Sequence, residues 1–249
     1  MNTLFDKTAA SLKGRTALVT GANGGLGEQF VLQALQRGAL KVYAAARAPR
    51  DWADSRIQPL SLDITSADAV TRAVMAAPDV DLLINNAAIA PQGDSLLGPE
   101  DEARAVFDTN YFGTLRVANA FAPVLAANGG GTILNILSLA VWISMPTAYA
   151  ASKAAMWSAT NGLRFALEAQ GTQVIGLHVG MVDTPMTAHL DTPKSNPAIV
   201  VAQAYDGIAA GDIEVLADSL TVDLKSRLGT KAEEFYPWLH EQLRAFAAS

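Results

Sequence analysis

A glycine-rich segment near the start of the chain, Gly21 to Gly27, joins an apolar run to an amphipathic one. The apolar run, residues 16–20, has the composition of a buried strand, and residues 28–37 have the apolar spacing of a helix that Gly38 would end. Between a strand and a helix, glycines let the backbone approach a pyrophosphate, and the helix N-terminus directs free N–H groups toward it. The segment therefore predicts a dinucleotide site in an α/β fold, with an ordinary strand-to-helix turn as the simpler alternative.

Strand and helix patterns alternate along the rest of the chain. Short apolar runs suited to strands occur at residues 16–20, 41–46, 57–62, 80–84, 131–137, 173–179 and 213–217. Continuous runs of Val, Ile and Leu are typical of parallel strands that are buried on both faces. Since the chain has 249 residues, no internal repeat and no linker, we expect one domain, residues 1–249. Its expected fold is a doubly wound, Rossmann-type sheet of seven parallel strands with helices on both faces.

A tyrosine and a lysine, Tyr149 and Lys153, share one face of a predicted helix, and Ser138 precedes the tyrosine by eleven residues. A nearby ammonium group favours the phenolate and so lowers the pKa of a tyrosine, which is ordinarily about 10. Such a phenol can give or take a proton at a carbonyl or alcohol oxygen, and the serine hydroxyl can hydrogen-bond the same oxygen. The pair alone is weak evidence, because this spacing occurs by chance on many helices.

Together with the glycine spacing, these residues resemble the short-chain dehydrogenase/reductase family, over roughly residues 13 to 187. Asn85-Asn-Ala-Ala88 is similar to the family's Asn-Asn-Ala-Gly segment, and Asp63-Ile64 is similar to its adenine contact. Asn110 matches the helix asparagine of the catalytic tetrad. Residues 179–184 resemble the family's Pro-Gly-x-x-x-Thr segment, with Val179 in place of the proline.

The resemblance implies an oxidoreductase that interconverts a ketone or aldehyde and an alcohol by hydride transfer. Tyr149 would be its general acid and base, and Ser138 would orient the oxygen. Lys153 would also bind the nicotinamide ribose, and Asn110 would support a water that links Lys153 to solvent. The implied catalytic residues are Asn110, Ser138, Tyr149 and Lys153. The implied cofactor-binding residues are Gly21, Asn23, Gly25, Leu26, Gly27, Arg47, Asp63, Ile64, Asn86, Ala87, Tyr149, Lys153, Gly180, Val182 and Thr184.

The end of the second predicted strand bears on the choice between NAD and NADP. An acidic residue there would bind the ribose hydroxyl of NAD, whereas an arginine suits the additional phosphate of NADP. In this chain Arg47 follows the strand directly, and Arg50 is close enough in sequence to assist it. We therefore predict NADP(H) as the cofactor. If Arg47 is only a solvated loop residue, Asp51 is the replacement candidate for a ribose contact.

In the family fold, the segments after the fourth, fifth and sixth strands wall the substrate pocket. Here they are mostly apolar, and the candidate pocket residues are Ile89, Leu139, Ala140, Trp142, Met145, Met181 and Met186. This character favours a hydrophobic or aromatic carbonyl substrate over a sugar or a charged acid, although Trp142 is equally consistent with the core. Residues 184–197 are interpreted as a mobile substrate loop, and Ser144 as a weaker competitor of Ser138.

Composition excludes several other classes of function. The net charge of −6 argues against a nucleic-acid partner, and three scattered histidines with no cysteine make a metal site improbable. No apolar run is long enough for a membrane span, and the first twelve residues lack the pattern of a signal peptide. We expect a cytoplasmic enzyme that binds a small-molecule carbonyl or alcohol substrate and no metal, membrane or nucleic acid.

Two alternatives remain open at this stage. A 3-oxoacyl reductase of the same family would need a basic rim for its acidic acyl carrier, and near the predicted site Lys194 is the clearest cation. A non-catalytic NADP-binding sensor would have no need of the complete set Asn110, Ser138, Tyr149 and Lys153.

Small residues on several faces of residues 149–167, together with the resemblance, predict a homodimer or homotetramer paired through this helix and the one at about residues 100–127.

Overall fold

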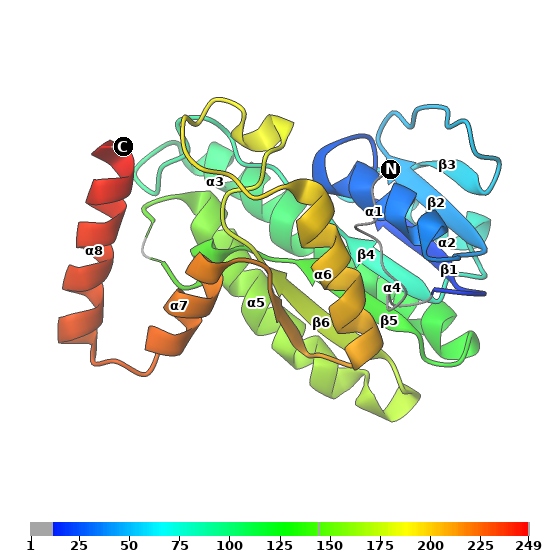
Figure 1. The fold of residues 1–249 in the computed structure, drawn as a ribbon. Coiled ribbons are helices and arrows are strands. Elements are labelled where there is room, and N and C mark those ends of the chain that lie inside the picture. The colour runs from blue at the N-terminus through cyan, green and yellow to red at the C-terminus, as the bar shows by residue number, and fades with distance from the viewer. Residues whose placement is uncertain (1–11, 144, 249) are drawn as a thin grey trace, which may run out of the picture.

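The computed structural model describes residues 12–143 and 145–248 and forms one parallel sheet flanked by helices (Figure 1). The strands are β1 (Thr16–Thr20), β2 (Lys41–Ala46), β3 (Ile57–Ser61), β4 (Leu82–Asn85), β5 (Thr132–Ile136), β6 (Gln173–His178) and β7 (Glu214–Leu216). Their order in the sheet is β3-β2-β1-β4-β5-β6-β7. The predicted fold class is confirmed. The predicted bounds of β1 and β2 match the observed ones, and the other predicted strands differ by one or two residues at their ends.

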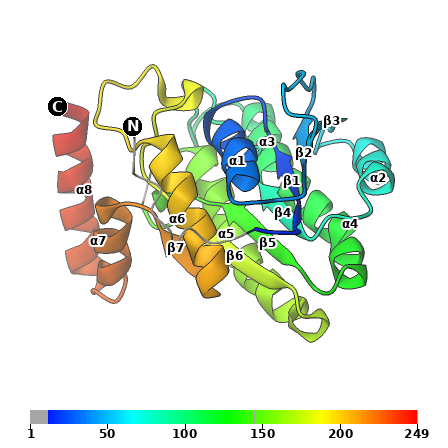
Figure 2. The same ribbon diagram turned by 45° about the vertical axis from the view of Figure 1, so that its right-hand side comes forward.

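Helices cover both faces of this sheet. The longer ones are α1 (Gly25–Gln36), α2 (Ala67–Ala76), α3 (Glu100–Phe107), α4 (Thr114–Ala127), α5 (Ala148–Ala166), α6 (Pro197–Ala210), α7 (Ser219–Arg227) and α8 (Ala232–Ala248). Figures 1 and 2 show α1 and α6 on one face and α2, α4 and α5 on the other. Short 3-10 turns are η2 (Leu139–Val141), η3 (Glu168–Gln170) and η4 (Pro185–Thr187).

The central strands β1, β4 and β5 are buried along their whole length because each packs on both faces, whereas the edge strand β3 is largely exposed. In β1, Ala17 and Val19 belong to the core layer under α1 and α6, whereas Leu18 belongs to the opposite layer under α4. This alternation follows from the two-residue period of a strand. Each fully buried aliphatic side chain contributes about 1.5–3 kcal/mol, so the two layers together hold the sheet rigid.

The region expected as one helix near residues 100–127 is divided into three parts. α3 runs into a π-helical turn, η1 (Asp108–Gly113), and α4 continues from it. A π-turn widens a helix locally and is common at functional sites. Asn110 lies within η1, so the irregular turn coincides with a predicted catalytic residue.

A third apolar cluster lies beyond β6 and β7, at the end of the molecule where Figure 1 shows α7 and α8. Leu224 of α7 and Phe235 and Leu239 of α8 pack there against η2 and Trp142.

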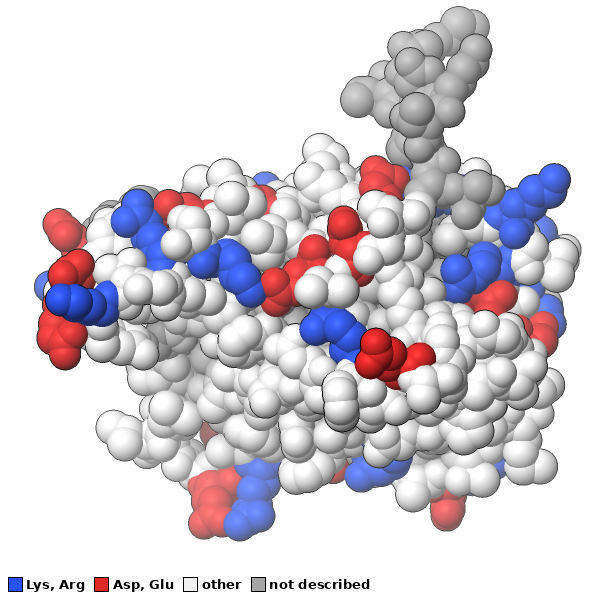
Figure 3. Space-filling model, turned by 90° about the horizontal axis from the view of Figure 1, so that it is seen from below, with Lys and Arg blue, Asp and Glu red and all other residues white. Residues whose placement is uncertain are grey.

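In the part of the chain that the structure describes, no helix is both long and apolar enough to cross a membrane. On the face seen in Figure 3, Lys and Arg side chains are interspersed with Asp and Glu. The predictions that concern the first eleven residues and Ser144 lie outside the described residues.

Candidate active site

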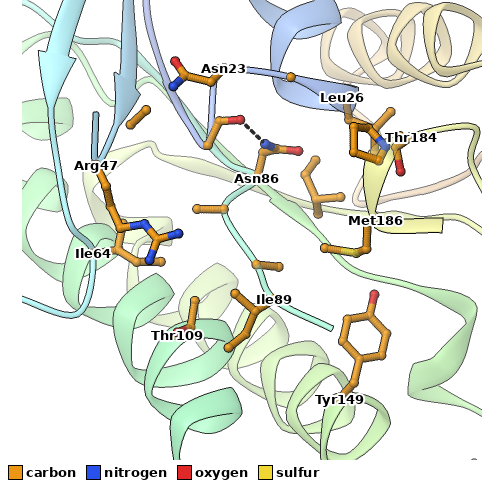
Figure 4. A pocket seen from close by; sticks show the side chains of 18 of the residues that line it. Asn23, Leu26, Arg47, Ile64, Asn86, Ile89, Thr109, Tyr149, Thr184 and Met186 are labelled. Atoms are coloured by element: carbon orange, nitrogen blue, oxygen red, sulfur yellow. Dashed lines mark hydrogen bonds between the residues drawn. The ribbon is translucent and has the colours of Figure 1, made fainter. Parts of the chain in front are cut away.

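The order of the strands brings the turns after β1 and β4 together, because these strands are neighbours in the sheet. At the end of β1, the Thr20 hydroxyl accepts from the amides of Asn86 and Ala87, each at 3.0 Å. The Asn86 side chain donates to the carbonyls of Thr20, at 2.9 Å, and Gly21, at 3.1 Å. Figure 4 shows one hydrogen bond of Asn86 as a dashed line. These bonds fix the glycine segment against the segment that follows β4.

Two of the glycines are required by close backbone packing. Gly21 has a φ of +67°, and a Cβ there would lie 3.0 Å from the Ala87 Cα. A Cβ on Gly27 would lie 2.1 Å from the Gly21 carbonyl oxygen, closer than any side chain can approach. The N-cap of α1, Gly24, offers no side chain to the first amides of the helix. The segment therefore has the open backbone and free N–H groups that bind a pyrophosphate.

A cavity of about 930 Å³ opens beside this segment. Its lining contains most of the predicted cofactor residues, namely Gly21, Asn23, Gly25, Leu26, Arg47, Asp63, Ile64, Asn86, Ala87, Gly180, Val182 and Thr184. It also contains Ser138, Tyr149 and Lys153, together with Ile89 and Met186. Figure 4 shows Arg47 and Ile64 toward one end, Tyr149 and Met186 toward the other, and Ile89 between them.

The end of the cavity beside β2 carries Arg47, which is exposed and close enough to Asp63 to interact electrostatically. The pKa of Asp63 is lowered mainly by hydrogen bonds from Thr65, and the charge of Arg47 contributes less. Arg50 lies outside the lining, contrary to the expectation that it assists Arg47: it is ion-paired with Glu28 and stacks over Trp52 with its guanidinium carbon 4.0 Å from the ring centre. Asp51 is also outside the lining.

At the other end, the Lys153 ammonium nitrogen lies 5.8 Å from the centre of the Tyr149 ring and donates to the Ile136 carbonyl at 2.8 Å. Burial lowers the pKa of Lys153 to about 8. Burial also raises the pKa of Tyr149, and the hydrogen bond with Ser138 lowers it to a smaller extent. The expectation that the pKa of Tyr149 is pulled down is therefore wrong in this structure, because desolvation of the phenolate outweighs the stabilising contact.

Local hydrogen bonds orient the serine. Ser138 lies two residues after β5 and caps η2, and its hydroxyl oxygen accepts from the Ala140 amide at 3.1 Å. The Leu139 amide donates to the Val179 carbonyl at 2.9 Å, which ties this turn to the end of β6. Only a small fraction of Ser138, 8 %, is exposed. The hydroxyl is therefore held in one place at the cavity wall.

Asn110 does not line the cavity but lies directly behind it. Its side-chain amide accepts from the Ile89 amide at 2.8 Å and donates to the Ile89 carbonyl at 2.9 Å. It also donates to the Ser152 hydroxyl at 3.1 Å. Asn110 thus holds the segment after β4 against α5, the helix that carries Tyr149 and Lys153.

Several predicted pocket residues lie outside the cavity lining. They are Leu139, Ala140, Trp142, Met145 and Met181, and among the predicted cofactor residues Gly27 is also outside, packed against Gly21. Trp142 is buried and stacks on His178 with ring centres 4.3 Å apart. Leu139 and Ala140 form part of the third apolar cluster under α7. This packing explains the apolar character of Leu139, Ala140 and Trp142, whereas the contact of Met145 and Met181 with a substrate stays a prediction.

The cavity has lining residues that sequence reasoning missed. Ala105 of α3 and Asp108 and Thr109 of η1 face it from the helix that precedes Asn110. Their spacing of three to four residues is the helical period, which is the signal that points to a shared face. Thr109 lies between Ile64 and Ile89 (Figure 4).

Comparison with known proteins identifies the family of the chain. The chain matches the short chain dehydrogenase family over residues 15–195. It is 31% identical over 228 residues to an uncharacterized oxidoreductase of Myxococcus xanthus, covering 83% of this chain and 88% of that protein. It is 32% identical to 1-deoxy-11-beta-hydroxypentalenate dehydrogenase of Streptomyces avermitilis over 92% of each chain.

A solved structure shows the same architecture along most of the chain. It is a short chain dehydrogenase from Burkholderia cenocepacia in complex with NADP, with a TM-score of 0.85 and 34% identity. The alignment covers 92% of this chain and 99% of that one. The chain therefore belongs to the short-chain dehydrogenase family and is an oxidoreductase of that family.

Proposed function

We propose that the protein is an NADPH-dependent carbonyl reductase or alcohol dehydrogenase in which Tyr149 is the general acid and base. The observation that carries this proposal is the presence of Ser138, Tyr149 and Lys153 in the same cavity as the glycine segment. A proton donor, a hydroxyl donor and a pyrophosphate cradle in one cavity are the parts that carbonyl reduction requires.

The glycine geometry fits a dinucleotide, since Gly24 lines the cavity with open space where a side chain would stand, and Gly21 and Gly27 let the turn pack closely beside it. Asn86, Ala87, Gly180, Val182 and Thr184 would hold the nicotinamide half, and Asp63 and Ile64 the adenine. When bound, the cofactor supplies or accepts the hydride.

The remaining steps belong to the side chains at the cavity wall. In reduction, Tyr149 transfers its phenolic proton to the carbonyl oxygen of the substrate as that oxygen gains charge. The Ser138 hydroxyl donates a hydrogen bond to the same oxygen and holds it in line with the phenol. Because burial raises the pKa of Tyr149, the phenol keeps its proton at neutral pH, the state that reduction needs.

NADP is favoured over NAD by the charge at the adenosine end. Arg47 lines the cavity there, whereas Asp51, the nearest acid after β2, does not. An arginine binds a phosphate through two charge-assisted hydrogen bonds. The Burkholderia cenocepacia relative is solved in complex with NADP, which supports the same choice.

The substrate end of the cavity favours a neutral, apolar compound. Met186 lies on the Tyr149 side of the cavity (Figure 4), and the lining also contains the apolar residues Ile89, Val182 and Pro185. Few polar groups there could replace the water around a sugar or a carboxylate, so desolvation would oppose such substrates. The name of the Streptomyces avermitilis relative indicates oxidation of a hydroxylated carboxylate, which is consistent with alcohol chemistry but differs in charge from the neutral substrate proposed here.

A spectrophotometric screen of hydrophobic ketones, aldehydes and alcohols with both cofactors tests the proposal. We expect NADPH oxidation with apolar or aromatic ketones. Turnover of 3-oxoacyl thioesters in preference to these ketones would favour the 3-oxoacyl reductase instead. Tight NADPH binding with no turnover of any carbonyl compound would favour the non-catalytic sensor.

Replacing Lys153 by methionine should weaken NADPH binding and move the pH optimum of alcohol oxidation upward. The substitution removes a cation that faces the Tyr149 ring and would contact the ribose. In the wild type the ammonium is present below a pKa of about 8 and is lost as the pH rises through it. Affinity for NADPH should therefore fall over that range, as fluorescence titration at several pH values would show. If the pH dependence of alcohol oxidation is the same in Lys153→Met as in the wild type, the proposed role of the Lys153 charge is contradicted.

Assembly should be visible in light scattering as a dimer or tetramer at micromolar concentration. α5 exposes small residues and, near its end, Phe165, which is 81 % exposed. A large exposed aromatic side chain beside small residues is suited to a symmetric interface. Phe165→Glu should shift the protein toward monomer, whereas Met75→Glu, at a similarly exposed position of α2, should not. A wild type that is purely monomeric would refute the prediction.

A further inference from the structure

We propose that Asp94 is a positioning residue that sets the place of the Tyr149 phenol, an inference that rests on the proposed function. Asp94 lies in the segment between β4 and α3, 55 residues before Tyr149. One oxygen of its carboxylate accepts from the Ala148 amide at 3.0 Å. The other accepts from the backbone amide of Tyr149 itself at 2.7 Å.

The contact goes beyond an ordinary helix cap, because α5 has one already. Thr147 is the N-cap, and its hydroxyl oxygen accepts from the Ala150 amide at 3.1 Å. The amides of Ala148 and Tyr149 remain, and a carboxylate from a distant part of the chain accepts from both. All three amides of the first helical turn therefore have acceptors, and two of these bonds are charge-assisted.

The same segment is anchored at two further points. The segment begins near Ile89, a cavity-lining residue, and the Asn110 side chain hydrogen-bonds both the amide and the carbonyl of Ile89. Past Asp94, the Leu96 amide donates to the Pro146 carbonyl at 2.9 Å, just before α5 begins. The cavity wall after β4 and the first turn of α5 are thus joined on both sides of Asp94.

This arrangement bears on the reaction because Tyr149 lies in the turn that Asp94 holds. The phenolic oxygen is at the far end of its side chain, so a small rotation of the turn displaces it from the substrate oxygen. A displacement of about 1 Å can lower a rate by roughly 100-fold. Asp94 is not itself a cavity-lining residue and contacts Tyr149 at its backbone amide, so its effect passes through the backbone of Tyr149.

The test compares Asp94→Asn and Asp94→Ala with the wild type and with a matched control, Ser66→Ala. Ser66 caps α2 through the Ala69 amide, and it is not among the cavity-lining residues. The asparagine variant keeps the shape and one acceptor oxygen, which preserves folding. Three quantities are measured for each protein: kcat for ketone reduction, the Kd for NADPH by fluorescence, and hydrogen exchange of the amides in the first turn of α5.

We expect kcat to fall by about 10-fold in Asp94→Asn and further in Asp94→Ala, with the Kd for NADPH changed by less than about 2-fold. The amides of Ala148 and Tyr149 should exchange faster in both variants, and Ser66→Ala should change neither kcat nor this exchange. Unchanged exchange in both Asp94 variants, or faster exchange with normal kcat, would overturn the proposal. Failure of the proposed function is recognised separately, as a wild type that reduces no carbonyl compound.

Discussion

Replacing Tyr149 by phenylalanine should lower kcat by at least about 100-fold, the contribution that general acid catalysis typically makes. The ring is retained, so the shape of the cavity and the affinity for NADPH should change little. The transferable proton is lost, and the Ser138 hydroxyl cannot replace it as an acid. Steady-state kinetics of ketone reduction, with NADPH binding measured on the same preparation, provide the check.

A second tyrosine offers the matched control for this substitution. Tyr236 lies on α8, is 45 % exposed and does not line the cavity. Tyr236→Phe should therefore leave kcat near that of the wild type. Turnover of Tyr149→Phe that also stays near the wild-type rate would contradict the mechanism, because no other tyrosine lies among the cavity-lining residues of the described chain.

Replacing Arg47 by aspartate should reduce or reverse the preference for NADPH. A charge-assisted, bidentate contact contributes roughly 1.5–3 kcal/mol, so the wild type should prefer NADPH over NADH by about 10- to 100-fold in kcat/KM. The aspartate adds repulsion against the phosphate and offers an acceptor to the ribose of NADH. Because Arg47 is exposed, rising salt should weaken the wild-type preference as well.

Arg50 provides the control for this experiment. It is close in sequence but outside the cavity lining, and it is engaged with Glu28 and Trp52. Arg50→Asp should therefore change the ratio of kcat/KM for the two cofactors much less than Arg47→Asp does. If the wild type uses both cofactors equally, or prefers NADH, the role of Arg47 is refuted. Asp51 would then be the next candidate for a ribose contact.

The parts of the fold that depend on local sequence could be predicted. The order of strands and helices follows from alternating apolar patterns, and the glycine segment marks the first turn because backbone packing at Gly21 and Gly27 leaves no room for a side chain. The position of Asn110 was clear from its motif. Its π-helical surroundings were not, because a bulge of this kind depends on the packing of η1 between the β4 segment and α5.

Features that depend on tertiary contacts could not be predicted from the sequence. Trp142 has the same apolar character whether it lines a pocket or, as here, stacks on His178. The spacing of Tyr149 and Lys153 says that they are close but not how deeply they are buried, and burial decides the direction of both pKa shifts. Asp94 carries no motif, and its contact with α5 depends on how the segment after β4 folds back.

The most direct test of the central claim is to follow the hydride itself. NADPH that carries deuterium in both positions at C4 of its nicotinamide ring is incubated with the protein and a hydrophobic aromatic ketone. The alcohol product is then analysed by mass spectrometry. We expect one deuterium atom in the alcohol formed by the wild type, and almost no product from Tyr149→Phe in the same time. An alcohol without deuterium, or no alcohol from any ketone that enters the cavity, would contradict the proposal that this protein is an NADPH-dependent carbonyl reductase.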